Sequence, residues 1–140
     1  SSSIHQTNFS KHNYHPPECH CRSSIVPHPN TIHYPAWFSV AARNKAMAHN
    51  ASTEQHDRQP LDVVMYGDSI TEHWLGMAFL DTKPELEEDA KAFRKYFTHA
   101  GGSELEGIPL GISGDRTQDL LWRVQNGELP RELRAKVFWL

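Results

Sequence analysis

The sequence predicts an α/β fold in three layers, with helices on both faces of a parallel sheet. Three observations lead to this prediction. The apolar run 61–66 follows a proline and stops at Gly67, as a buried strand does. Two shorter apolar runs follow at 108–112 and 136–140, and helical spacing of apolar residues fills the intervals between the three runs. Strands that alternate with helices are typical of parallel sheets, whose active sites gather at the carboxyl ends of the strands.

The helices are expected in the following places. Apolar residues at helical spacing begin at Trp37 and predict a first helix that ends near Asn50. A second helix is expected to start at Ser69, directly after the first strand. A third is predicted within residues 84–99 and closed by Gly101 and Gly102.

The last helix is expected to follow the turn 113–115. Asp115 is a candidate N-cap residue with Gln118 three positions later, and Gly127 is the expected stop. The strand that begins at Lys136 is expected to be cut off at Leu140, so we expect the N-terminal portion of a larger domain.

Composition divides the chain into two parts. Residues 1–35 are rich in His, Pro, Ser and Asn without an apolar period, and they predict a disordered or loosely packed lead-in. Residues 36–140 are expected to form the incomplete domain. Residues 1–60 carry five Lys/Arg against three Asp/Glu, and residues 61–140 carry nine against fourteen. Neither part has the basic concentration that nucleic-acid binding requires.

Other classes of partner find little support in the sequence. No apolar run approaches the roughly 20 residues of a membrane span, and the oligomeric state and the compartment are left open. The cluster of His15, Cys19, His20 and Cys21 could bind a transition metal, but solvated tail composition is the favoured interpretation. We therefore expect no metal and no cofactor.

Two loops at expected strand ends contain residues with catalytic chemistry. Ser69 lies at the junction of a strand and a helix, where free N–H groups face a developing oxyanion. Gly114 lies in the second loop, where a residue without a Cβ lets the backbone approach a substrate. Local patterns alone favour simpler roles, because Ser69 with Glu72 reads as a capping box and Gly111 and Gly114 read as turn residues.

Both loops taken together resemble a known family. The segment 62–72, with Gly67-Asp68-Ser69, is similar to the first signature block of the SGNH (GDSL-type) hydrolases, and segment 111–129 resembles the second block. The second block is most similar to the catalytic subunits of type I platelet-activating-factor acetylhydrolase and related esterases. The resemblance implies a flavodoxin-like α/β/α fold, Ser69 as nucleophile and oxyanion N–H donor, and Gly114 as a second N–H donor.

The sequence also departs from the family pattern. The interval from Ser69 to Gly114 is longer than in the animal enzymes, with extra residues around 84–99, so their substrate is not carried over. The family takes a third oxyanion donor from a Gly-x-Asn block and its base from an Asp-x-x-His block, and neither block occurs in the 140 residues. His73, one helical turn after Ser69, is a weak substitute for the base.

Three hypotheses remain open. The first is an ester hydrolase in full-length form, acting on a small-molecule ester or an acylated carbohydrate, with the 140-residue chain nearly inactive. The second is a non-catalytic SGNH-like domain that binds such a ligand. The third is a phosphate- or flavin-binding module that uses the same strand-end loops to hold an anion.

Overall fold

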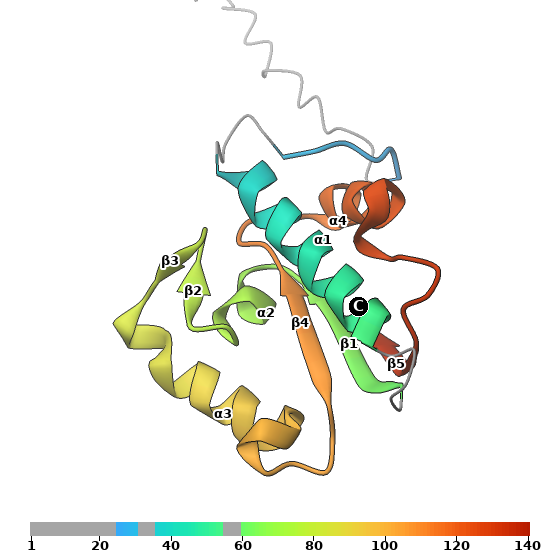
Figure 1. Ribbon diagram of the computed structural model, residues 1–140. Coiled ribbons are helices and arrows are strands. Elements are labelled where there is room, and N and C mark those ends of the chain that lie inside the picture. Colours follow the sequence, from blue (N-terminus) through green and yellow to red (C-terminus); the bar gives the residue numbers. More distant parts are fainter. Residues whose placement is uncertain (1–24, 31–35, 55–59) are drawn as a thin grey trace, which may run out of the picture.

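The computed structural model describes residues 25–30, 36–54 and 60–140, and it shows an α/β fold (Figure 1). Three parallel strands form the main sheet in the order β4-β1-β5. Their bounds are Leu61–Gly67 for β1, Gly107–Gly111 for β4 and Ala135–Trp139 for β5. The expected α/β class with a parallel sheet is thus confirmed, and β1 occupies the centre of the three strands.

In the described residues, four α-helices and a small hairpin accompany the sheet. The helices are α1 (Trp37–Glu54), α2 (Ser69–His73), α3 (Glu87–Phe97) and α4 (Thr117–Arg123). Shorter helical turns are η1 (Pro84–Leu86), η2 (His99–Gly101) and η3 (Val124–Glu128). The hairpin consists of β2 (Met77–Ala78) and β3 (Asp81–Thr82), which pair antiparallel.

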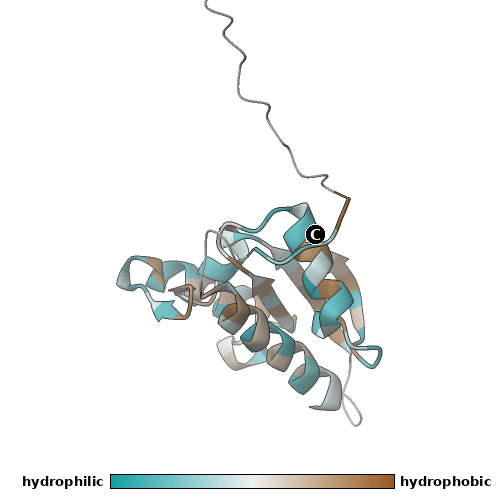
Figure 2. Cartoon of the chain, turned by 90° about the horizontal axis from the view of Figure 1, so that it is seen from above, coloured by the Kyte–Doolittle hydropathy of each residue, from teal (hydrophilic) through white to brown (hydrophobic). Residues whose placement is uncertain are grey.

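Alternate side chains of β1 face two separate apolar cores. Val64 and Tyr66 belong to a core that also receives Ala48 of α1 and Leu120 of α4. Val63 and Met65 face the other side of the sheet, where they pack with Phe93 and Phe97 of α3. Because successive strand residues point to opposite faces, one apolar strand joins both helical layers. The strands, coloured largely as apolar, lie between helices in Figure 2.

Several element boundaries differ from the expected ones. Helix α1 continues past Asn50 to Glu54. Helix α3 ends at Phe97 rather than at the Gly-Gly pair, because Thr98 is extended and its hydroxyl accepts a hydrogen bond from the Gly101 N–H. These differences are of the size expected at helix ends, where side-chain caps decide the final residue.

Asp115 does not cap helix α4, so that expectation was wrong. The helix begins at Thr117, and the Asp119 carboxylate accepts a hydrogen bond from the Arg116 N–H at 3.0 Å. The Asp115 carboxylate is occupied elsewhere, in an ion pair with Arg123. Gly127 does lie where the helical segment ends, with a positive φ of 99°.

Residues 25–30 lie inside the expected lead-in and contact the loop at the start of α4. The His28 N–H donates to the Gln118 carbonyl at 3.3 Å, and Asn30 is buried. Figure 1 shows this segment in blue, crossing above α4 before the chain enters α1. The rest of the expected lead-in, with its His and Cys cluster, lies outside the described residues. Among the described helices, none combines the length and apolar character of a membrane span.

Strand β5 leaves large apolar side chains on the surface. Val137 and Trp139 are more than half exposed, and Phe138 and Leu140 are exposed as well. β5 hydrogen-bonds to β1 on one side, and in the described part of the chain no strand pairs with its other side. A strand with exposed apolar side chains and a free edge favours association with another polypeptide segment.

Candidate functional site

The two candidate loops follow neighbouring strand ends. Gly67 at the end of β1 is in register with Gly111 at the end of β4, and the Ile112 N–H donates to the Gly67 carbonyl at 3.2 Å. Ser69 comes two residues after Gly67, and Gly114 comes three residues after Gly111. The fold therefore places the two loops side by side at the carboxyl edge of the sheet, where α/β proteins bind their ligands.

Ser69 is the first residue of α2, and it is not the helix cap. Asp68 is the N-cap residue, and its carboxylate accepts a hydrogen bond from the Ile70 N–H at 3.0 Å. Glu72 is buried and turned toward other partners, so the capping box of Ser69 and Glu72 that local spacing favours does not form. The serine side chain is thereby free of a capping role, and it is partly exposed. As the first helical residue, Ser69 also has an N–H that no carbonyl of its own helix can accept.

Two glycines let α2 rest directly on the sheet. A Cβ on Gly67 would overlap the Thr71 side chain. A Cβ on Gly111 would overlap the backbone of Asp68 and Glu72. These glycines are needed for close approach, since any side chain there would push the helix that begins at Ser69 away from the strands.

Gly114 adopts a left-handed backbone conformation at the surface. Its φ is 77°, which favours glycine over any residue with a side chain. The turn that contains it is closed by the Asp115 N–H, which donates to the Ile112 carbonyl at 3.1 Å. The Gly114 carbonyl accepts a hydrogen bond from the Asn30 side chain at 3.2 Å. The loop is thus restrained at its start, where it leaves β4, and at Gly114, where segment 25–30 contacts it.

Glu72 joins the two candidate loops, a role that sequence reasoning missed. Its Oε2 accepts a hydrogen bond from the Ser113 N–H at 2.8 Å. Its Oε1 accepts one from the Phe79 N–H at 3.1 Å and lies 3.4 Å from Nη1 of Arg43. The burial of Arg43 lowers its pKa, and the Glu72 carboxylate opposes that shift. A buried carboxylate that accepts several hydrogen bonds fixes all of their donors.

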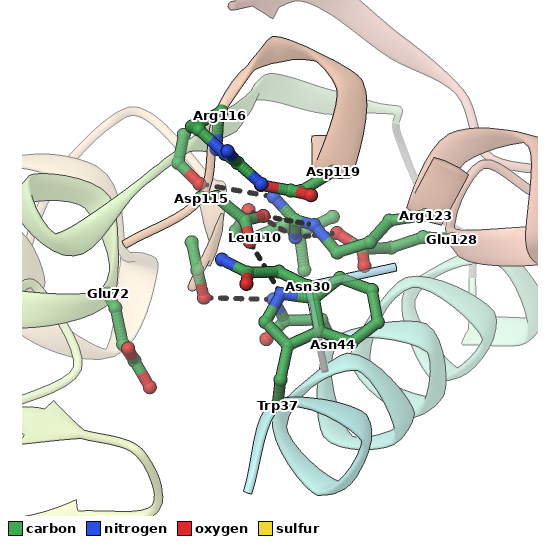
Figure 3. A network of polar contacts seen from close by, with 12 residues as sticks. Asn30, Trp37, Asn44, Glu72, Leu110, Asp115, Arg116, Asp119, Arg123 and Glu128 are labelled. Atoms are coloured by element: carbon green, nitrogen blue, oxygen red, sulfur yellow. Dashed lines mark hydrogen bonds and ion pairs between the residues drawn. The ribbon is translucent and has the colours of Figure 1, made fainter. Parts of the chain in front are cut away.

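A buried arginine lies beneath the same edge of the sheet (Figure 3). Arg123 donates to the carbonyls of Gly67 and Leu110, each at 3.1 Å. Its Nη1 also lies 2.6 Å from Oε1 of Glu128, and its Nε lies 2.8 Å from Oδ2 of Asp115. The guanidinium therefore connects the ends of β1 and β4 with the residue that follows Gly114. The sequence offered one signal of this buried arginine, which is its position among Leu120, Leu121 and Val124. A charge within an apolar stripe needs buried partners.

The two carboxylates around Arg123 have raised pKa values. Burial raises the pKa of Asp115 to about 6, although Arg123 and the Trp37 indole N–H oppose the shift. Burial likewise raises the pKa of Glu128 to about 7 against the opposing effect of Arg123. Two carboxylates share one guanidinium, so the cluster can take up a proton near neutral pH.

Three of the four described histidines contact partners other than the serine. His28 lies 3.4 Å from Asp119, His49 contacts the Gly127 carbonyl, and His99 lies 3.4 Å from Glu106. His73 ends α2. Within residues 25–30, 36–54 and 60–140, no side-chain hydrogen bond joins a histidine to Ser69. The described part of the chain thus presents the serine and the glycine loop without a paired base.

Fold and site together define an α/β protein with a serine at a strand-to-helix junction and a glycine loop beside it. No family model matches the chain. Over 92 residues the chain is 30% identical to the platelet-activating factor acetylhydrolase IB subunit alpha1 of Rattus norvegicus, Bos taurus and Homo sapiens. These residues make up 66% of this chain and 31% of each relative. The chain therefore spans about a third of the length of these curated relatives, and the similarity supports a distant relation at the level of the family.

Proposed function

We propose that this chain carries the nucleophile and part of the oxyanion hole of an SGNH-type serine ester hydrolase. The observation that carries the proposal is the arrangement of the Ser69 and Gly114 loops at adjacent strand ends, joined through Glu72. The distant relation to an acetylhydrolase supports the same class of reaction. In this proposal residues 36–140 are the N-terminal portion of the hydrolase domain.

The reaction proceeds through an acyl-enzyme. The Ser69 Oγ bonds to the acyl carbon while a histidine base takes the hydroxyl proton, and the carbonyl π electrons move onto oxygen. The N–H groups of Ser69 and Gly114 stabilise that oxyanion. Collapse of the intermediate breaks the ester C–O bond and releases the alcohol, which receives the proton. Water then attacks the acyl group, releases the acid and restores the serine.

The base and the third oxyanion donor have no counterpart among the 140 residues. The resemblance assigns them to an Asp-x-x-His block and a Gly-x-Asn block, and the sequence contains neither. Removing one oxyanion donor costs about 10²–10³ in rate, and removing the base costs more. We therefore assign the activity to a longer chain. The substrate class is a small-molecule ester or an acylated carbohydrate.

The test uses a longer chain that continues through an Asp-x-x-His block. It should hydrolyse a short-chain aryl ester, and Ser69→Ala should reduce kcat by about 10³-fold or more without unfolding the protein. Ser39→Ala, at an exposed position of α1, is the matched control and should keep full activity. Full activity in the Ser69→Ala variant would overturn the serine assignment. A longer chain that lacks the Asn or the His and binds esters without turnover would instead establish a binding domain.

A further inference from the structure

We infer that Glu72 is a positioning residue that aligns the nucleophile loop with the oxyanion loop. The inference rests on the proposed function and adds a residue to its machinery. Glu72 lies one helical turn after Ser69 on α2, and its carboxylate reaches across to the residue that precedes Gly114. One buried side chain therefore links the helix of the nucleophile to the loop of the second N–H donor.

The contact with the second loop is made to its backbone. Oε2 of Glu72 accepts the Ser113 N–H at 2.8 Å, and both residues are buried. That bond fixes the peptide of Ser113, and the next peptide carries the Gly114 N–H. Because an oxyanion hole works only when its donors are aimed in advance, restraining the preceding peptide preorganises the Gly114 N–H.

The position of Glu72 has no local explanation. Asp68 caps α2, so a carboxylate three residues after Ser69 is not needed at the helix start. Glu72 is fully buried, and a buried carboxylate is costly unless its oxygens find donors. Its donors come from three other parts of the fold, which are the loop after β4, the β2–β3 hairpin and α1.

The hairpin contact shows that the same carboxylate also holds a strained segment. The two residues at the tip, Phe79 and Leu80, have positive φ values of 50° and 69°. Such a turn normally uses Asn and Gly, since other residues are strained there. Glu72 Oε1 accepts the Phe79 N–H at 3.1 Å, and the Phe79 side chain packs on the core of Trp37, Val40 and Ile112.

A carboxylate is required because both of its oxygens face N–H donors. In Glu72→Gln the amide NH₂ must replace one oxygen. Oε1 faces two donors, the Phe79 N–H and Arg43, so the amide oxygen takes that side and the Ser113 N–H faces the NH₂ in place of an acceptor. The substitution keeps the size of the side chain and changes only its hydrogen bonds. It is therefore a sharper test than Glu72→Ala, which also leaves a cavity.

The experiment measures kcat and KM in the longer, ester-hydrolysing chain, and the exchange of the Ser113 and Gly114 amide protons by NMR. Glu72→Gln should reduce kcat by about 10²-fold with KM changed by less than about threefold, because misaligned donors act on the transition state. Amide exchange at Ser113 should speed up by about tenfold or more once its acceptor is lost. Val64→Ala, a cavity in the core away from the loops, is the control for lost stability alone.

The outcomes separate the two claims. If Glu72→Gln loses no more kcat than Val64→Ala while hydrolysis still depends on Ser69, the positioning role is overturned and the proposed function stands. If the wild-type chain shows no Ser69-dependent hydrolysis, both fall together. Unchanged Ser113 exchange in Glu72→Gln also contradicts the inference, whatever the hydrolysis assay shows.

Discussion

Individual buried charges fix the geometry of the candidate site. Glu72 and Arg123 lie at the same carboxyl edge of the sheet. Arg123 donates to carbonyls at the ends of β1 and β4, and Glu72, on the helix that follows β1, accepts a hydrogen bond from the loop after β4. Neither charge is exposed to solvent. Removing one partner of such a cluster leaves the others buried without compensation, so single substitutions here should have large effects.

The raised pKa of Glu128 predicts a specific pH dependence of stability. The folded protein keeps the Glu128 proton up to about pH 7, whereas the ordinary pKa is 4.5. Because this folded-state pKa is raised, its contribution to the free energy of unfolding is greatest below pH 4.5 and is lost as the pH rises toward 7. Glu128→Gln has no carboxyl proton to lose, so across that range its free energy of unfolding should fall by roughly 3 kcal/mol less than that of the wild type.

Urea unfolding at a series of pH values checks this prediction. As the pH rises from 4.5 to 7, the free energy of unfolding of the wild type should fall relative to that of Glu128→Gln. Glu132→Gln, at an exposed position, is the control and should leave the shape of the curve unchanged. Parallel curves for the wild type and Glu128→Gln would contradict the assignment of the titrating group.

At the scale of elements, the β2–β3 hairpin is the least favourable piece of local structure. Its two-residue turn places Leu80 at a φ of 69° with partial exposure. A residue with a side chain costs about 1–2 kcal/mol in that conformation relative to glycine. Leu80→Gly should therefore raise the free energy of unfolding by about 1 kcal/mol, measured by urea titration.

A matched glycine substitution gives the opposite sign. Ala92→Gly, at an exposed position within α3, should lower the free energy of unfolding by about 1 kcal/mol. If Leu80→Gly also destabilised the protein, the Leu80 side chain would be contributing more through packing than its backbone conformation costs.

The elements were more predictable than the site contacts. The continuous apolar run of β1 fits a strand buried on both faces, and the apolar stripe of α3 fits a helix buried on one face. The structure contains both elements. Ser69 begins a helix as expected. The capping interpretation failed because Asp68 competes for the same role and is one residue earlier. Nothing local to Glu72 reveals donors at Ser113 or Arg43, which only the folded chain brings to it.

For the molecule as a whole, we expect β5 to determine whether the chain associates in solution. Its exposed apolar residues and free edge predict that the 140-residue chain associates with itself. Replacing Val137 and Trp139 together by Lys should shift the chain toward a monomer, because charged side chains on an edge strand oppose pairing.

Sedimentation velocity over a range of concentrations measures this effect. Leu105→Lys, an exposed apolar position in the loop before β4, provides the control and should leave association unchanged. A wild-type chain that stays monomeric at all concentrations would contradict the role given to β5.

The hydrogen bond between Asn30 and Gly114 affects where the working unit begins. These residues are 84 positions apart in the sequence, and the bond joins the segment before the first helix to the glycine loop. A protein engineer who trimmed the chain to the start of α1 would keep every helix and strand that the structure describes and still remove one of the contacts that restrain the loop. Segment 25–30 therefore restrains the glycine loop, and chain boundaries should be set upstream of it.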